Sequence, residues 1–121
     1  MQNMIRILLK SKIHRATVTH TDIHYDGSLG IDADLMRAAD IVPYEQVHVY
    51  NINNGERFET YAIEEAPASG AVILRGAAAR KGVNGDLIII TTFTPVDDRK
   101  CINFNPAVIL VDEANRQKEE S

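Results

Sequence analysis

Gly27 and Ser28 are the two neighbouring residues whose types and order could change the covalent backbone of this chain. A serine hydroxyl can attack the carbonyl of the residue before it, which turns the peptide bond into an ester. Glycine at the first position lets the backbone take a strained conformation and leaves its carbonyl open to attack. A Gly-Ser dipeptide taken alone is, however, most often a simple turn. The surrounding residues must decide between these two interpretations.

The four histidines raise the separate question of a metal site. His20 and His24 have the spacing of a metal-binding pair, but only if both lie on one face of a helix. Thr17-Val18-Thr19 favours a strand in this region, and no cysteine lies nearby to complete a site. We therefore expect no metal.

Composition bounds the class of protein. The chain has 121 residues, of which 45% are hydrophobic and 25% charged, as in a soluble single-domain protein. Thirteen basic and 17 acidic residues give a net charge of −4 without a basic cluster, so we expect no nucleic-acid partner. The single Cys101 fits a reducing compartment, where it would be a small hydrophobic residue. The apolar run Ile7–Leu9 is too short for a membrane span, and we expect a cytoplasmic protein without a membrane partner.

The first half of the chain predicts strands around one short helix. Residues 4–19 are rich in β-branched and apolar types, and Leu29-Gly30-Ile31 is a second short apolar stretch. Asp32 or Asp34 is a candidate N-cap for a helix over residues 35–39.

The clearest local pattern is a hairpin. Residues 47–52 and 57–63 alternate as strands, and Asn54-Gly55 predicts a type I′ turn with positive φ at both central residues. Arg57, Glu59, Tyr61 and Ile63 should then share one face. A polar outer face accounts for Arg57 and Tyr61 as well as a functional site does.

The second half of the chain predicts further strands. Gly76–Ala79 is either the start of a short helix or a place where backbone approaches something closely. The other expectations are a strand at 72–74, a strand at 86–93 buried on both faces, a loop at 95–100, a last strand at 107–111, and a charged tail at 112–121 that is frayed or helical. So many short strands favour a closed barrel over an open sheet.

The order of several motifs resembles the bacterial aspartate 1-decarboxylase family, which is pyruvoyl-dependent and serves pantothenate synthesis. These motifs are Lys12-Ile13-His14-Arg15, Tyr25-Asp26-Gly27-Ser28, the run Asn54–Tyr61, Gly76-Ala77-Ala78-Ala79 and Gly85-Asp86. The resemblance covers nearly the whole chain. It implies a mainly β fold, a double-psi β-barrel with one or two short helices, as a single domain over residues 1–121. It also implies a homotetramer and self-cleavage into residues 1–27 and 28–121.

The same resemblance implies the chemistry. Ser28 would attack the Gly27 carbonyl, with the Thr60 hydroxyl as an oxyanion donor, and would end as a covalent pyruvoyl group. That group would form a Schiff base with L-aspartate and act as an electron sink while carbon dioxide leaves. Tyr61 would return a proton to the α-carbon, and β-alanine would be released.

The remaining residues implied by the resemblance bind the substrate. Arg57 would hold the side-chain carboxylate with two parallel hydrogen bonds, and Lys12 would be a second cation, arriving with His14 from a neighbouring subunit. Tyr25 and Tyr50 would line the pocket. Backbone at Gly76, Ala77 and Ala78 would approach the substrate. Taken one at a time, these residues favour simpler interpretations: Lys12 as a solvated lysine, His14 as an ordinary surface or core histidine, and Tyr50 as a core aromatic residue. Only the joint order of the motifs favours the site.

Two positions depart from the family pattern. Arg75 stands where members usually have asparagine, and a larger, permanently charged side chain there could slow or rearrange cleavage, point away, or add a cation for aspartate. Tyr50 replaces a frequent tryptophan and keeps an amphipathic aromatic ring. Arg75 also gives weight to a competing hypothesis, a non-enzymatic β-barrel binding module in which Gly27-Ser28 is a plain turn. A metal enzyme is a third, weaker hypothesis, and a maturation factor is a further candidate partner.

Overall fold

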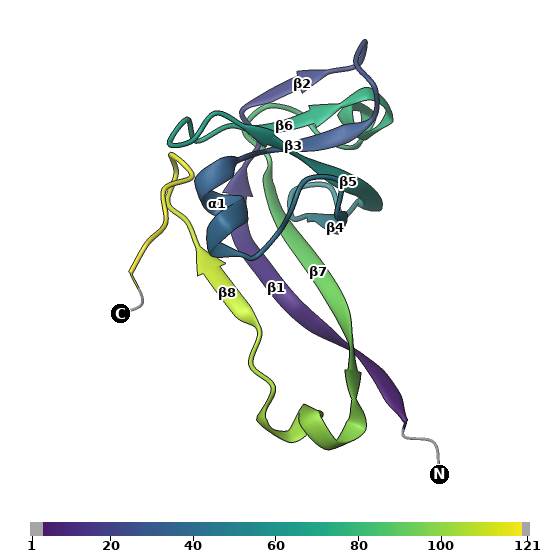
Figure 1. The fold of residues 1–121 in the computed structure, drawn as a ribbon. Coiled ribbons are helices and arrows are strands. Elements are labelled where there is room, and N and C mark those ends of the chain that lie inside the picture. Colours follow the sequence, from purple (N-terminus) through teal and green to yellow (C-terminus); the bar gives the residue numbers. More distant parts are fainter. Residues whose placement is uncertain (1–3, 120–121) are drawn as a thin grey trace.

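The computed structural model describes residues 4–119, and within that range the chain is mainly β. Eight strands are joined by one short α-helix and two 3₁₀ helices (Figure 1). In chain order they are β1 (Ile5–Thr17), β2 (His20–Asp22), β3 (Ser28–Asp32), α1 (Ala33–Ala38), β4 (Gln46–Asn51), β5 (Arg57–Glu65), β6 (Val72–Arg75), η1 (Gly76–Lys81), β7 (Leu87–Asp97), η2 (Asp98–Asn103) and β8 (Ala107–Leu110).

The strands form one mixed sheet in the order β2-β6-β3-β5-β4-β7-β1-β8. Three pairs are parallel: β1 with β8, β2 with β6, and β3 with β5. Beyond the end of β1, the Thr19 N–H donates to the Val72 carbonyl at 2.8 Å, and the Val72 N–H donates to the Thr19 hydroxyl at 3.0 Å. These bonds bring the end of β1 against β6, so the sheet curls and encloses a core.

The core is made by alternate side chains of the strands. Ile13, Leu29 and Val49 are fully buried, as are Ile88 and Ile90. On the expected fully buried strand at 86–93, Leu87 and Ile89 are only half-buried and Phe93 is exposed, while Thr91 and Thr92 are both buried. Burial on both faces therefore holds only at Thr91 and Thr92 and was wrong for the rest of this strand.

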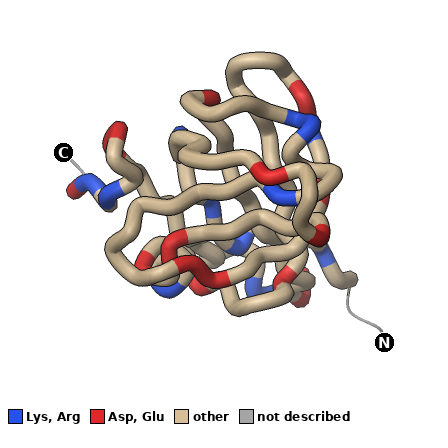
Figure 2. Tube along the Cα trace, turned by 90° about the horizontal axis from the view of Figure 1, so that it is seen from above, with Lys and Arg blue, Asp and Glu red and all other residues tan. Residues whose placement is uncertain are grey.

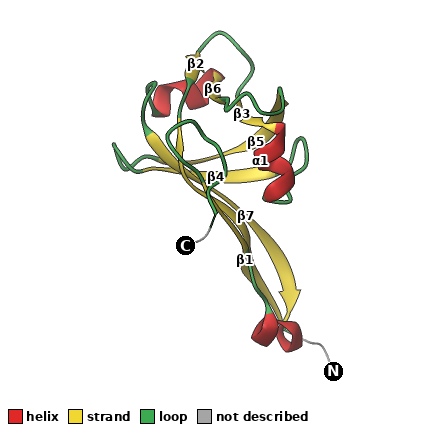
Figure 3. Cartoon of the chain, turned by 90° about the vertical axis from the view of Figure 1, so that its left-hand side faces the viewer, coloured by secondary structure: helices red, strands yellow, loops and turns green. Residues whose placement is uncertain are grey.

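A long two-stranded ribbon of β1 and β7 projects from the body, with η2 at its far end (Figures 1 and 3). Their antiparallel register runs from Ile5 opposite Asp97 to Thr17 opposite Leu87. The expected loop at 95–100 was wrong, because Pro95 continues the strand opposite Ile7. Proline is tolerated where its missing N–H faces no strand, and β4 borders β7 only up to Thr91.

Helix α1 begins as the sequence predicts. The Asp32 carboxylate accepts the Asp34 N–H at 2.8 Å, which confirms Asp32 as the N-cap. The same carboxylate accepts the N–H groups of Ala68 and Gly70, so it also fixes the turn before β6. None of the helices in residues 4–119 is long and apolar enough to cross a membrane.

The β4–β5 hairpin is confirmed, but its predicted type I′ turn was wrong. Gly55 has φ of +76°, whereas Asn54 is not among the residues with positive φ. The Asn51 side-chain oxygen accepts the N–H groups of Asn53 and Asn54, and the Gly55 N–H donates to the Asn51 carbonyl. The Asn51 side chain thus takes up backbone N–H groups of the turn, and a wider loop forms in place of the two-residue turn.

The C-terminal segment also differs from expectation, since residues 112–118 are neither frayed nor helical. They form a turn in which Asn115 is 2% exposed. The Asn115 amide bonds both the N–H and the carbonyl of Thr17, and it also donates to the Gly70 carbonyl. The Lys118 N–H then donates to the Leu110 carbonyl at 2.7 Å. Residues 120–121 of the expected tail lie outside the described residues.

Candidate active site

Ser28 lies at the wall of a pocket of about 380 Å³ and is only 4% exposed. The residues that line it come from the segment before β3, from the start of β3, from the loop between α1 and β4, and from β5 and β6. They are Tyr25, Asp26, Ser28, Tyr44, Tyr61, Ile63, Glu65 and Arg75. A hydroxyl that is shielded from water but open to a small cavity suits covalent chemistry on a small molecule.

The sheet register places Ser28 among its neighbours. Ser28 pairs with Arg75 across the antiparallel β3/β6 ladder, and Leu29 pairs with Ala62 across the parallel β3/β5 ladder. Extending the parallel register backwards brings Ser28 level with Tyr61. One further step brings Gly27 level with Thr60, on the opposite face of β5 from Tyr61.

Gly76 makes a close backbone contact with the segment before Ser28. It has φ of +62°, and a Cβ on it would lie 2.6 Å from both the Cα and the N of Gly27 and 2.7 Å from the Tyr25 carbonyl oxygen. Only glycine fits that approach. Gly76 also begins η1, so the run from Gly76 is both a helix start and a site of close approach, the two alternatives that the sequence left open.

Arg75 points into the pocket and forms an ion pair with Glu65. The guanidinium carbon lies 5.2 Å from the centroid of the Tyr25 ring. The hydrogen bond to Glu65 is the main cause that raises the pKa of Arg75 above its usual value. The sequence singled out Arg75 but missed Glu65. A partly buried arginine needs an acidic partner, and that requirement was the available signal.

Four other predicted residues lie away from this pocket, on the outer face of the sheet. Lys12 and His14 are two residues apart on β1 and therefore share one face of that strand. Tyr50 of β4 pairs with Arg57 of β5. The Arg57 guanidinium carbon stacks 4.0 Å from the centroid of the Tyr50 ring. Lys12 lies on the same face, because it pairs with Thr91 of β7, which in turn pairs with His48 of β4, two positions from Tyr50.

The distance along β5 separates these outer-face residues from those around Ser28. Arg57 and Tyr61 share a face but are four positions apart, which is about 13 Å along a strand. The two carboxylates of one aspartate are much closer together than that. Within one chain, the structure therefore brings together Tyr25, Gly27, Ser28, Tyr61 and the run from Gly76, and it leaves Lys12 and Arg57 elsewhere.

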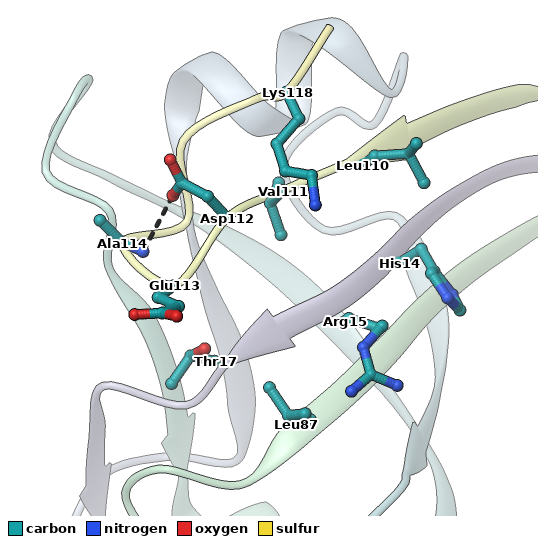
Figure 4. Close-up of a pocket in the computed structure, with 10 residues that line it drawn as sticks. All are labelled: His14, Arg15, Thr17, Leu87, Leu110, Val111, Asp112, Glu113, Ala114 and Lys118. Carbon is teal, nitrogen blue, oxygen red and sulfur yellow. Dashed lines mark hydrogen bonds between the residues drawn. The ribbon is translucent and has the colours of Figure 1, made fainter. Parts of the chain in front are cut away.

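His14 lines a separate and larger pocket of about 650 Å³, together with Arg15 and residues of the C-terminal turn (Figure 4). Ser28 is not among its lining residues. Burial lowers the pKa of His14, and the charges of Lys12 and Arg15 lower it further. Its Nδ1 atom is buried and has no hydrogen-bond partner within residues 4–119. A neutral imidazole is thus favoured at neutral pH.

Charged groups are spread over the fold. Figure 2 shows basic and acidic positions on several elements rather than gathered on one. In the described part of the chain, no three His, Cys, Asp or Glu side chains form a group able to hold a metal ion.

Comparison with known proteins agrees with that geometry. A model of the family described as aspartate decarboxylase matches residues 4–118. Aspartate 1-decarboxylase of Bordetella parapertussis is 52% identical over 116 residues, covering 96% of this chain and 95% of the relative. The enzyme of the same name from Herminiimonas arsenicoxydans is 55% identical, covering 93% and 94%. That from Syntrophobacter fumaroxidans is 56% identical, covering 93% and 91%.

The site and these matches define a carboxy-lyase. The chain belongs to the aspartate decarboxylase family, whose members depend on a pyruvoyl group. This membership confirms the resemblance that the motif order indicated.

Proposed function

We propose that this chain cleaves itself between Gly27 and Ser28, converts Ser28 to a pyruvoyl group, and then decarboxylates L-aspartate to β-alanine. The observation that carries the proposal is the position of Ser28. Ser28 lies at a pocket wall with glycine before it in the sequence, Tyr61 in the same pocket lining, and the Gly76 backbone pressed against the preceding segment. Membership of the family makes the substrate assignment.

The residues present fit a pyruvoyl group at position 28. Ser28 is nearly buried, and the pocket of about 380 Å³ beside it is large enough for a substrate the size of aspartate. When formed, the group supplies an electron sink for decarboxylation. Arg75, Tyr61 and Tyr25 supply hydrogen-bond donors around it.

The chain's own residues would then perform two tasks. Thr60 would be level with Gly27 if the β3/β5 register continued two residues before Leu29, and it is the proposed donor to the oxyanion that forms when Ser28 attacks. Tyr61 is 36% exposed in the single chain and faces the pocket, so its phenol is the proposed proton donor to the α-carbon. The two residues lie on opposite faces of β5, which suits separate steps on the two sides of Ser28.

Substrate binding requires a second copy of the chain. Lys12, His14, Tyr50 and Arg57 would reach the Ser28 pocket of a neighbour, because about 13 Å of strand separates Arg57 from Tyr61 within one copy. We propose a homotetramer with sites shared between subunits, on the strength of this separation and the family resemblance. Arg57 would bind the side-chain carboxylate, with Lys12 beside it.

We further propose that the single domain is a double-psi β-barrel located in the cytoplasm. Three parallel strand pairs within a curled, mainly antiparallel sheet support the barrel. The proposed cut leaves residues 1–27 and 28–121 within that one domain. The backbone at Gly76, Ala77 and Ala78 would border both the cut and the bound substrate.

The denatured intact mass of the chain tests the proposal. We expect two fragments separated after Gly27, with the larger one lighter than a free serine N-terminus by the elements of ammonia, and β-alanine formed from L-aspartate. Ser28→Ala should stay one chain without activity. Wild-type protein should be incubated alone and in a cell extract, which shows whether a maturation factor takes part. An intact wild-type chain in both conditions, or activity in Ser28→Ala, contradicts the mechanism.

A further inference from the structure

The ion pair between Arg75 and Glu65 lies directly beside the proposed cut. Arg75 is opposite Ser28 in the β3/β6 ladder, and Glu65 ends β5, the parallel neighbour of β3. Each side chain is only 18% exposed. A pair so shielded from water gives back much of its attraction in desolvation, so fold stability alone explains it poorly.

The fold leaves space for this pair at Gly30. A Cβ on Gly30 would collide with the Glu65 Oε2 atom and lie 2.7 Å from the Arg75 Nη1 atom. Gly30 does not have a left-handed φ, so its backbone conformation is open to other residues. A larger residue at this position would therefore displace the two charged side chains from the places they occupy.

Tyr25 rests on the guanidinium that Glu65 holds. The Arg75 guanidinium carbon is 5.2 Å from the centroid of the Tyr25 ring, within the range of attraction between a cation and an aromatic face. Tyr25 is 62% exposed, so packing alone holds it weakly. It precedes Gly27 by two residues, and its own carbonyl faces Gly76. The contact with Arg75 thus fixes the segment that carries the scissile carbonyl.

We propose that Arg75, held in place by Glu65, is a positioning residue for self-cleavage that keeps the Tyr25–Gly27 segment against β6. This inference rests on the proposed function. In the first step, the Ser28 Oγ bonds to the Gly27 carbonyl carbon, the bond from that carbon to the Ser28 nitrogen breaks, and the Oγ proton passes to that nitrogen. No co-reactant is consumed. Arg75 makes and breaks no bond; it holds the carbonyl within reach.

A different role for Arg75, as the main cation for a substrate carboxylate, fits the pocket less well. Glu65 already neutralises the guanidinium, and the Asp26 carboxylate lines the same cavity. An incoming carboxylate would meet two acidic groups and one cation. The two roles make different predictions, because positioning changes the cleavage rate and substrate binding changes KM.

The test uses the full chain made in a cell-free extract, with cleavage followed over time by denatured intact mass. Arg75→Gln, Glu65→Gln and Tyr25→Leu should each slow cleavage about two- to fivefold, the loss expected from one cation–aromatic contact. Arg75→Lys should retain part of the rate. Glu64→Gln is the matched control, because it makes the same change one residue away at a side chain that is itself exposed and points to the opposite face of β5, and it should cleave as wild type does.

The double variant Arg75→Gln/Tyr25→Leu separates positioning from a general loss of stability. If the two residues act through one contact, the double variant is no slower than Arg75→Gln alone, whereas independent effects multiply. Multiplying effects, or wild-type cleavage in both Arg75→Gln and Glu65→Gln, overturn the proposal. Unchanged cleavage with a raised KM for L-aspartate in Arg75→Gln would move Arg75 to the substrate site and overturn it too. A wild-type chain that stays intact refutes the proposed function itself. Failure of the proposed function is thereby distinguished from failure of the positioning role of Arg75, which requires a wild-type chain that cleaves.

Discussion

Replacing Gly76 with alanine would test whether the close approach of η1 to the scissile segment sets the cleavage geometry. The new Cβ would lie 2.6 Å from the Cα and N of Gly27, whereas ordinary van der Waals contact begins at 3.4 Å. The difference, 3.4 minus 2.6, requires Gly27 and the added methyl group to separate by about 0.8 Å. The contacting atoms are backbone, so no flexible side chain can absorb the shift.

Two separate costs follow from Gly76→Ala. Alanine in a left-handed conformation costs about 1–2 kcal/mol, which lowers the free energy of unfolding by that amount. A displacement approaching 1 Å at a reacting bond costs on the order of a hundredfold in rate. We therefore expect Gly76→Ala to remain folded and to cleave about a hundred times more slowly than the wild-type chain.

Gly55→Ala is the matched control, because Gly55 has φ of +76° with nothing within 4 Å of its added Cβ. It carries the same conformational cost without the collision. The assay is the fraction of cleaved chain against time by denatured mass, beside urea unfolding of both variants. Equal cleavage rates in Gly76→Ala and Gly55→Ala would refute the reasoning, since strain alone would then account for both.

Three further predictions concern other parts of the molecule. Asn115→Ala should lower the free energy of unfolding in urea by about 3 kcal/mol, because three backbone groups, at Thr17 and Gly70, lose their buried or partly buried side-chain partner. Asn105→Ala, at an exposed residue, should change it by less than about 0.5 kcal/mol, and equal effects would contradict this. By NMR, His14 should titrate below 6.5, and Lys12→Gln should raise its pKa only partly, since burial is the larger cause. Because the folded pKa lies below the unfolded one, His14 should make the fold less stable as pH falls from 6.5 through the folded pKa, and a titration at or above 6.5 would exclude this. Arg57→Ala should raise KM for L-aspartate about ten- to hundredfold with cleavage unchanged, and an unaltered KM would remove Arg57 from the site.

Local patterns predicted the elements well where neighbouring residues alone decide the structure. The alternation along β5 placed Arg57, Glu59 and Tyr61 on one exposed face, as the structure has them. Asp32 was a predicted N-cap because its partner is only two residues away. The turn at Asn54-Gly55 failed because a third residue, Asn51, offered its side chain to the same N–H groups.

Long-range partners were beyond local reasoning. Asn115 sits in a charged segment that looks like a solvated tail, yet its partner Thr17 is 98 residues away in the sequence. The alternation of β5 places Glu65 on its outward face, and only the position of β5 and β6 on either side of β3, with Gly30 between them, brings Glu65 to Arg75. The order of the motifs indicated candidate site residues, but not that the chain would carry them as two separate groups.

The pairing of the first two strands has a consequence for the lifetime of the molecule. Among the described residues, β1 pairs with β7 and β8, and β2 pairs with β6, so every strand pair made by residues before Gly27 crosses the proposed cut. Folding of the intact precursor is a unimolecular reaction, whereas the cleaved form could reassemble only by a second-order encounter of two peptides. The mature protein would therefore recover slowly, and in a concentration-dependent way, from any full denaturation. Its persistence would then depend on the unfolding rate rather than on an equilibrium between folded and unfolded chains.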